Sequence, residues 1–230
     1  MNNFVKSFNT LFFGLIVTLF VLSLSISLPL FIRQFYYWHI DLYNIVEITG
    51  VSKENLIFSF NELMDSLMFF KPFSEGVFPF SEEGKSHFLD CQVLFVLDYV
   101  VLIISFVLLV IYLIALRKNK NLIYRPFNMS ISVIMLFIPL LLIGALGTYA
   151  LIDLNGAYAF FHKIFFPGKS NWVFDVYKDP IIKALPQEFF INCGILILGS
   201  YLTIYLSILI FNIKRKITLG GSKVYYAKGV

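Results

Sequence analysis

The sequence predicts an all-α integral membrane protein, with four transmembrane helices and a small extracytoplasmic cap of short helices and loops. Hydrophobic residues make up 59% of the 230 residues and the mean hydropathy is +0.82, whereas soluble domains are about 45–50% apolar. Charged residues make up 14%, against about 25% in soluble domains. Because hydrocarbon tolerates few charges, these values indicate a chain that lies mostly in a membrane.

Four apolar segments are each long enough to cross a bilayer, which takes about 20 residues. They cover about residues 10–32, 92–116, 130–154 and 189–213. The first is longer than the apolar core of a signal peptide, and Ser27-Leu28-Pro29 is a poor cleavage site, so we interpret it as a retained helix. We therefore expect residues 1–230 to form a single integral membrane domain.

The distribution of charge predicts how the chain crosses the membrane. The flanks on one side, residues 1–9, 117–129 and 214–230, contain ten Lys and Arg residues and no acidic residue. All fourteen Asp and Glu residues occur elsewhere, from Asp41 to Glu188. The positive-inside rule then predicts that both termini are cytoplasmic and that residues 33–91 and 155–188 form the outer cap.

Two helix starts are predicted in the first cap segment. Ser52 has the position of an N-cap, and the helix after it is expected to end near Lys71-Pro72. Its apolar residues recur at helical spacing and must pack on the membrane surface or on the other helices: Leu56, Phe60, Leu63, Leu67 and Phe70. Ser81, followed by two glutamates, predicts a second helix that continues without a break into the second span.

The rest of the cap has weaker local signals. Residues 35–40, which are rich in aromatic side chains, indicate a short strand or an interfacial aromatic belt. Residues 167–171 contain Pro-Gly and predict a turn. Pro186 predicts the first turn of the helix that forms the fourth span.

The three histidines, His39, His87 and His162, all fall on the predicted outer side. Glu83, His87 and Asp90 are spaced i, i+4 and i+7, which places them on one face of a helix. A carboxylate beside an imidazole fixes its tautomer and raises its basicity, as a general base requires, although the same spacing also fits a solvated polar face.

The other two histidines have simpler interpretations from local sequence. His162 lies among aromatic residues, and an interfacial histidine that points to water would explain it. His39 follows Trp38 and is interpreted as part of the aromatic belt.

Several other functional classes find no support. The sequence contains no H-x-x-x-H pair, so we predict no metal site, and it contains no nucleophile elbow, phosphate loop or dinucleotide fingerprint. No basic run suggests nucleic acid as a partner. Cys91 and Cys193 are too few for a disulfide framework, and packing is favoured over pairing. Asp98 lies about two turns into the second span and either has a partner or sits at headgroup level.

Two motifs resemble the lipoprotein intramolecular transacylases, a family of bacterial four-span membrane proteins. The first is Phe80-Ser81-Glu82-Glu83 followed by His87-x-x-Asp90, although Cys91 stands where the family pattern has valine. The second motif is longer and more specific, and its parts follow one another in the second cap segment: Phe161-His162-x-x-Phe165-Phe166, Asn171-Trp172, Asp179-Pro180-Ile181-Ile182 and Leu185-Pro186-x-x-Phe189-Phe190. With the spans, the resemblance covers roughly residues 33–216.

The resemblance implies an enzyme of the bacterial plasma membrane, with its active site on the outer face. Its substrate would be a lipoprotein whose N-terminal cysteine carries a thioether-linked diacylglyceryl group. The sn-2 acyl chain would move to the α-amino group of that cysteine, without a cofactor, to give a lyso-form lipoprotein, while the acyl chains stay among the membrane lipids. His87 and His162 would be the catalytic histidines, with Asp90 or Glu83 supporting His87.

The resemblance leaves alternatives open. We expect Phe161, Phe165, Phe166 and Trp172 to line the substrate pocket, and we take His87 as the base, although the sequence does not decide which histidine has which role. A non-enzymatic membrane sensor or assembly factor with a lipid-binding cap is the alternative function. Transfer from a separate phospholipid is the alternative reaction. Acyl-chain preference and oligomeric state are not predicted.

Overall fold

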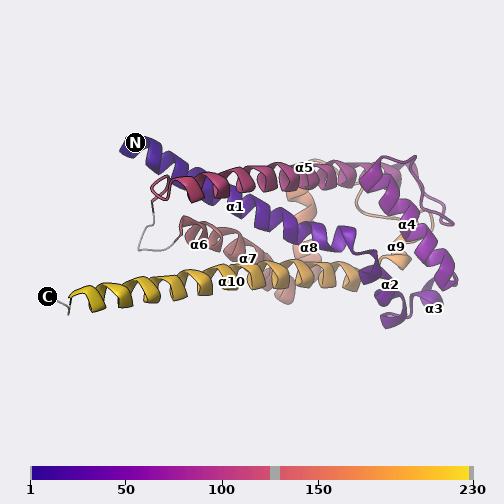
Figure 1. Cartoon of the computed structure of the whole chain (residues 1–230). Helices are drawn as coiled ribbons and strands as arrows, with labels where there is room; N and C mark the ends of the chain where they lie inside the picture. Colours follow the sequence, from indigo (N-terminus) through magenta and orange to yellow (C-terminus); the bar gives the residue numbers. More distant parts are fainter. Residues whose placement is uncertain (1, 125–129, 228–230) are drawn as a thin grey trace. The chain divides into compact units, whose positions relative to one another are not determined.

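A computed structural model describes residues 2–124 and 130–227 of the chain, with side chains described as far as residue 215. Within these residues all regular structure is helical (Figure 1). Two basic residues that entered the prediction of orientation, Arg125 and Lys228, lie outside the described residues, as do the side chains of Lys216 and Lys223.

Four helices of the described residues are long and apolar enough to cross a membrane, as the sequence predicted. These are α1 (Asn3–Phe31), α5 (Glu82–Lys118), the pair α6 (Ile131–Met135) and α7 (Phe137–Ile152), and α10 (Gln187–Ala227). The third span was expected to be one helix, but Leu136 separates α6 from α7.

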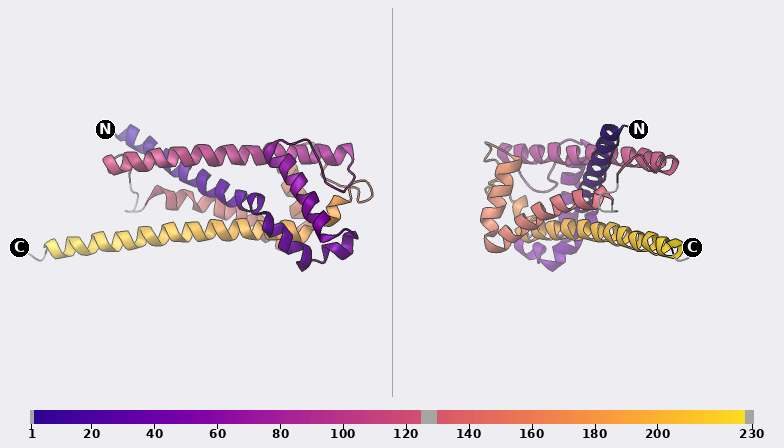
Figure 2. Two further views of the ribbon diagram at one scale, coloured as in Figure 1. Left: turned by 45° about the vertical axis from the view of Figure 1, so that its right-hand side comes forward. Right: turned by 90° about the vertical axis from the view of Figure 1, so that its left-hand side faces the viewer.

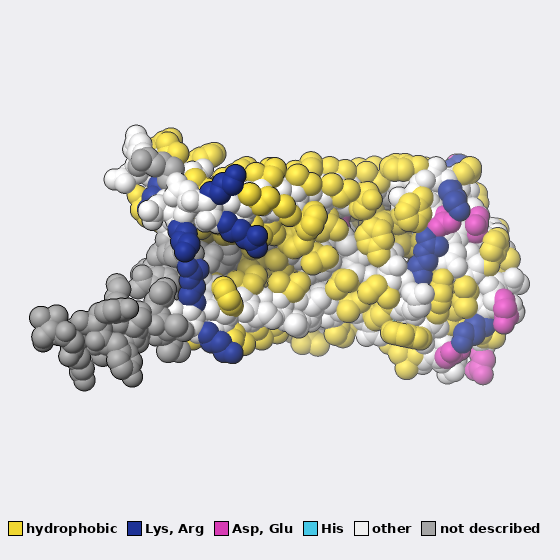
Figure 3. All heavy atoms as spheres, viewed as in Figure 1, with side chains coloured by type: hydrophobic (Ala, Val, Ile, Leu, Met, Phe, Trp, Pro, Cys, Tyr) yellow, Lys and Arg dark blue, Asp and Glu magenta, His cyan; other side chains and the backbone are white. Residues whose placement is uncertain are grey.

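The chain divides into two compact units. The first contains residues 1–25, 101–145 and 198–230, and the second contains residues 26–100 and 146–197. All fourteen acidic residues belong to the second unit, so the acidic side chains (magenta) seen in Figure 3 are all its own. The ten basic residues of the predicted cytoplasmic flanks all belong to the first unit.

The first unit has an apolar core built from α1, α6 and α10. Phe13, Val17 and Val21 of α1 cluster there with Leu136 and Tyr201, both of which are completely buried. The Tyr201 hydroxyl donates a hydrogen bond to the Leu136 carbonyl at 2.8 Å. This bond gives the buried Tyr201 hydroxyl a partner at the interruption between α6 and α7.

The second unit adds short helices, shown from further directions in Figure 2: α2 (Arg33–Leu42), α3 (Ile45–Thr49), α4 (Lys53–Phe69), α8 (Leu154–Phe165) and α9 (Ile181–Ala184). Helix α2 contacts α3 and α4, and α3 contacts α9. The possible strand at residues 35–40 is therefore wrong. Tyr36, His39 and Ile40 are buried on one face of α2, and their i, i+3, i+4 spacing is that of a helix.

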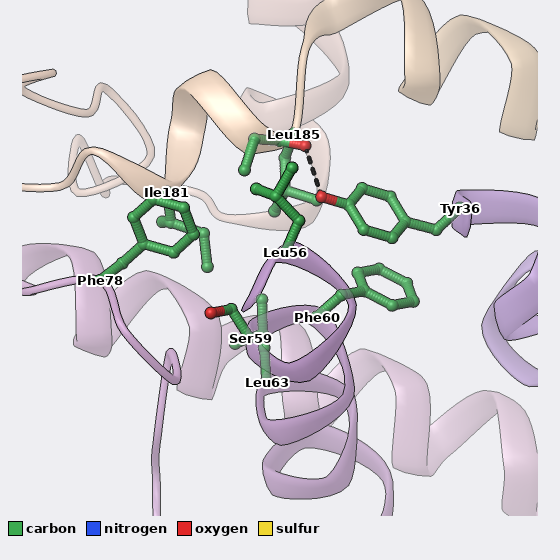
Figure 4. Close-up of a pocket in the computed structure, with 9 residues that line it drawn as sticks. Tyr36, Leu56, Ser59, Phe60, Leu63, Phe78, Ile181 and Leu185 are labelled. Carbon is green, nitrogen blue, oxygen red and sulfur yellow. Dashed lines mark hydrogen bonds between the residues drawn. The ribbon is translucent and has the colours of Figure 1, made fainter. Parts of the chain in front are cut away.

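Helix α4 supplies much of the core of the second unit (Figure 4). Its predicted N-cap is confirmed, since the Ser52 hydroxyl accepts a hydrogen bond from the Asn55 amide. Tyr36 stacks on Phe60 with ring centroids 4.0 Å apart and donates a hydrogen bond to the Ala184 carbonyl at 3.0 Å. Four of the five predicted apolar positions are buried, namely Leu56, Phe60, Leu63 and Leu67.

The fifth position, Phe70, does not belong to that stripe. It follows the last residue of α4 in a left-handed conformation, with φ 56°, and its side chain is 68% exposed. The stripe packs on other parts of the second unit, against Tyr36, Ile181 and Phe189, so it is not left to cover a membrane surface.

The prediction that His39 is part of an interfacial aromatic belt is also wrong. Its side chain is buried, and Nδ1 lies within hydrogen-bond distance of the Phe35 carbonyl. The amide Nδ2 of Asn192 lies 2.9 Å from Nε2 of the same ring. Both ring nitrogens are thus satisfied, which makes His39 a packed structural histidine.

The acidic residue within the second span has a hydrogen-bond partner. The Asp98 carboxylate accepts a hydrogen bond from the Ser27 hydroxyl at 2.8 Å, so this acid is paired, as its predicted depth requires. Cys91 and Cys193 are free thiols, which confirms packing over pairing.

Helix α5 is longer than a bilayer needs. Its 37 residues extend for about 55 Å, while the hydrocarbon core is about 30 Å thick. Residues 82–90 contain four charged side chains, whereas residues 92–116 contain Asp98 alone. The start of α5 is therefore polar, while residues 92–116 are apolar enough and long enough to cross a bilayer.

Candidate active site

His87 and His162 lie side by side in the second unit. Their ring centroids are 5.7 Å apart, with an angle of 38° between the ring planes. His87 comes from the polar start of α5 and His162 from α8, and the two side chains are only 5% and 7% exposed. Residues 75 positions apart in the sequence thus form one buried pair, and the expectation that His162 points to water is wrong.

The start of α5 is anchored by Asp179. The Ser81 amide and hydroxyl donate hydrogen bonds to the two carboxylate oxygens of Asp179 at 2.7 and 2.8 Å. The Ser81 hydroxyl also accepts from the Gly84 amide at 3.0 Å, which confirms the predicted N-cap. Gly84 has to lack a side chain, because a Cβ atom there would lie 2.3 Å from Asp179 Oδ1. These contacts fix the first turn of α5, and His87 follows one turn later.

Helix α8, which the sequence did not predict, places His162. Asp153 caps this helix by accepting a hydrogen bond from the Gly156 amide at 2.8 Å. Nδ1 of His162 lies 2.8 Å from the Tyr158 carbonyl, one turn earlier. Since a carbonyl only accepts, Nδ1 carries the proton and the neutral ring keeps its lone pair on Nε2. Within the described residues, this Nε2 has no hydrogen-bond partner.

Aromatic rings fix the His162 imidazole from two sides. Trp172 stacks on it with ring centroids 4.8 Å apart, and the Tyr158 ring lies at 4.0 Å. The Trp172 indole is itself held by a 3.0 Å hydrogen bond to the Lys169 carbonyl. The imidazole therefore has little freedom to rotate.

His87 has a different surrounding. Phe166 and Phe174 present near-perpendicular rings to it, with centroids at 4.9 and 5.5 Å. Its Nε2 lies 3.5 Å from the Cys91 sulfur. Its Nδ1 is buried and has no hydrogen-bond partner among the described residues, which is a costly state for a polar atom unless a ligand completes it.

The carboxylates expected to support His87 do not hydrogen-bond to it in the described part of the chain. Asp90 instead accepts hydrogen bonds from Asn171, at 2.9 Å, and from the Lys169 ammonium. The Glu83 side chain is exposed to solvent. The expectation that Asp90 or Glu83 orients the His87 ring through a hydrogen bond is therefore wrong. Asp90 holds residues 169–171 against α5, and acts on His87 only through its charge.

Burial keeps both imidazoles neutral at physiological pH. Burial and the neighbouring His162 lower the pKa of His87 to about 4, although the negative charge of Asp90 opposes this shift. Burial also lowers the pKa of His162, against the effect of its bond to the Tyr158 carbonyl. Burial alone would raise the pKa of Asp90, but its bonds from Lys169 and Asn171 outweigh it and lower the pKa. A neutral imidazole can both accept and donate a proton, as acid–base catalysis requires.

The expected aromatic lining is only partly in contact with the histidines. Phe166 is buried and its ring contacts both imidazoles, and Trp172 and Phe161 contact His162. Phe165 packs on Phe161 and is 46% exposed, with no ring contact to either histidine in the described structure. Sequence reasoning missed two contacts, Phe174 and Tyr158. Tyr158 had a signal, because it precedes His162 by four residues and so shares its helix face.

Comparison with known proteins identifies the class. The four spans and the paired imidazoles belong to a membrane acyltransferase, because residues 11–190 match the family model of the lipoprotein intramolecular transacylase Lit. This match covers well over half of the chain. The chain belongs to the lipoprotein intramolecular transacylase (Lit) family, which confirms the enzymatic interpretation over a sensor or assembly factor.

Solved structures agree. The membrane integral lipoprotein intramolecular transacylase Lit from Bacillus cereus superposes with a TM-score of 0.77 at 26% identity, covering 92% of this chain and 97% of that one. Two variants of the Bacillus cereus protein with one histidine replaced, by alanine or by arginine, give TM-scores of 0.74 and 0.70, at 25% and 26% identity. Each of these two matches covers 92% of this chain, and they cover 94% and 93% of the alanine and arginine variants, respectively. No curated protein sequence gives a significant match.

Proposed function

We propose that His87 and His162 together carry the intramolecular transacylation. The substrate is a lipoprotein whose N-terminal cysteine bears a diacylglyceryl thioether, and the sn-2 acyl chain moves to the α-amine of the same cysteine. One observation carries this proposal. Two neutral, buried imidazoles lie 5.7 Å apart, and each has one ring nitrogen that no described residue occupies.

His162 is assigned as the proton acceptor. Its Nδ1 is committed to the Tyr158 carbonyl, so the lone pair on Nε2 is the one available. An α-amine has a pKa of about 8 and must lose protons to form an amide. As the amine nitrogen attacks the ester carbonyl carbon, Nε2 of His162 takes up its proton. This assignment exchanges the roles expected from the sequence, in which His87 was the base.

His87 is assigned as the hydrogen-bond donor to the ester carbonyl oxygen. Attack converts this oxygen into an oxyanion, and a protonated Nδ1 of His87 can donate a hydrogen bond to it. When the tetrahedral intermediate collapses, the bond from the carbonyl carbon to the glyceryl oxygen breaks. That oxygen receives the proton held by His162, and both imidazoles return to their starting state. Ester and amine thus become alcohol and amide with no external reactant.

The aromatic side chains contribute by excluding water and by holding one geometry. Water would compete with the amine for the ester, and Phe166, Phe174 and Trp172 surround the imidazoles with apolar surface. Donor and acceptor belong to one molecule, so the enzyme needs mainly to bring them together. The acyl chains remain among the membrane lipids, and the reaction needs no cofactor.

The charge distribution supports an active site on the outer face of the bacterial plasma membrane. The unit that contains both histidines also contains every acidic residue, whereas the flanks that belong to the first unit are purely basic. By the positive-inside rule, the purely basic flanks support cytoplasmic termini. On the outer face the enzyme would meet lipidated proteins as substrates, and the proposed reaction involves neither nucleic acid nor a metal ion.

Replacement of each histidine tests the proposal. His87→Gln and His162→Gln should each abolish conversion of a diacylglyceryl lipopeptide by the purified full-length protein, while Lys163→Gln, an exposed neighbour, should convert it normally. Mass spectrometry of the lipopeptide N-terminus checks the route, because intramolecular transfer keeps the acyl count and transfer from a phospholipid adds one. Full activity in either glutamine variant, or an added acyl chain, would refute the proposal.

A further inference from the structure

Cys91 touches the imidazole that the proposed reaction needs as a hydrogen-bond donor. It lies one turn after His87 on α5, with its sulfur 3.5 Å from Nε2 of the ring. The second nitrogen of the same ring, Nδ1, is buried and has no hydrogen-bond partner in the described part of the chain. A neutral imidazole carries one proton. Whether Nε2 is protonated therefore decides whether Nδ1 offers a substrate a hydrogen-bond donor or an acceptor.

The chemistry of the two groups indicates which one donates. Burial and the negative charge of Asp90 raise the pKa of the Cys91 thiol to about 12, so the thiol keeps its proton. Sulfur is a weak acceptor, whereas the unprotonated nitrogen of an imidazole is a good one. The S–H group consequently donates to Nε2, and the ring proton resides on Nδ1.

We propose that Cys91 is a positioning residue, whose thiol holds the proton of His87 on Nδ1 and so presents an N–H group to the substrate carbonyl. This inference rests on the proposed function of His87. The two imidazoles then have complementary roles, one as hydrogen-bond donor and one as proton acceptor. In each ring the position of the proton is determined by a contact within its own helix. Cys91 Sγ, four residues later, sets His87, and the Tyr158 carbonyl, four residues earlier, sets His162.

The other ionisable groups near His87 do not compete for this role. His162, Asp90 and Lys169 influence its charge, but among the described residues none of them hydrogen-bonds to its ring. Cys91 is therefore the side chain in direct polar contact with the His87 imidazole. Without its S–H donor, the proton can move to Nε2, and Nδ1 becomes an acceptor that would repel a developing oxyanion.

Two substitutions separate the hydrogen bond from packing. Cys91→Val fills the space without a donor, and Cys91→Ala leaves a small cavity. Cys193→Ala, which removes the other half-buried thiol, is the matched control. Loss of one net hydrogen bond corresponds to about a 3- to 10-fold effect. We expect both Cys91 variants to lose about that much in kcat with little change in KM, and the control to match the wild type.

Nitrogen NMR of histidine-labelled full-length protein in detergent gives a readout that packing alone would not move. The wild type should show His87 protonated at Nδ1, and Cys91→Val should shift this proton toward Nε2 while His162 stays unchanged as an internal reference. A wild-type His87 protonated at Nε2, or a Cys91→Val enzyme with normal kcat, would overturn the role of Cys91. Failure of the proposed function is a distinct result, in which the wild type leaves the lipopeptide unconverted or His162→Gln remains active.

Discussion

Asp179 accepts two hydrogen bonds from Ser81, one from its amide and one from its hydroxyl, across 98 positions of the sequence. This relationship places the candidate site, because Ser81 caps the helix that carries His87. A residue of the second cap segment thus fixes where a helix of the first cap segment begins. The buried pair of histidines depends on this anchor as well as on its own contacts.

Asp179→Ala should therefore reduce both stability and activity. Two donors of Ser81 lose their acceptor, and unpaired polar groups of this kind cost about 1–3 kcal/mol each. We expect a lower melting temperature in detergent and a lower kcat, because the start of α5 and His87 lose their fixed position. Asp41→Asn, at an exposed site paired with Lys53, is the control. An unchanged melting temperature for Asp179→Ala would contradict the anchor.

Gly84→Ala should have a similar effect by steric means. The added Cβ would lie 2.3 Å from Asp179 Oδ1 and 2.8 Å from its Cγ, so the carboxylate must move away from Ser81. Overpacking of this kind costs about 1–3 kcal/mol. Gly194→Ala is a matched control in α10, because a Cβ there meets nothing within 4 Å. Thermal unfolding and turnover of both variants check the prediction, and equal behaviour of the two would refute it.

The spans and the helix starts could be predicted because their signals are local. Hydropathy over about 20 residues marks a span, and Ser52 and Ser81 each precede an acidic first turn. Helix α8 is amphipathic but was missed, because the capping role of Asp153, which marks where the helix begins, is visible only with the Gly156 amide in place.

Burial of the histidines could not be predicted from local sequence. His39 is satisfied by Asn192, which is 153 positions away, and Trp172 stacks on His162 from the segment that follows α8. The spacing of Glu83, His87 and Asp90 correctly described one helix face but not the partners that approach it. Lys169 and Asn171 occupy Asp90, so the carboxylate is unavailable to His87 as a hydrogen-bond acceptor.

Trp172→Ala should divert the ester toward hydrolysis. The indole stacks on His162, and its removal would admit water beside the base and leave the imidazole free to rotate. We expect slower transacylation and a new product, free fatty acid, which mass spectrometry of the reaction mixture detects. Trp38→Ala, whose side chain is 68% exposed, should yield no fatty acid. Absence of fatty acid with normal turnover in Trp172→Ala would show that this ring does not exclude water.

Glu75 should make the protein less stable as pH rises. Its carboxyl group is 1% exposed, and neither oxygen has a hydrogen-bond partner among the described residues. Burial, with a contribution from the negative charge of Asp179, raises its pKa from 4.5 to about 8. Between these values the folded protein keeps a proton that the unfolded chain has lost. The free energy of unfolding therefore falls with increasing pH through this window, by up to about 1.4 kcal/mol per pH unit.

Glu75→Gln isolates this effect, because the amide has nearly the same shape and stays neutral at every pH. The variant should lack this part of the pH dependence, so its melting temperature should exceed that of the wild type by a margin that grows from pH 5 to pH 8. Glu82→Gln, whose side chain is 86% exposed, should follow the wild type. If the melting curves of Glu75→Gln and the wild type stay parallel across this range, then Glu75 is already ionised in the folded protein, and a partner or water must stabilise its charge.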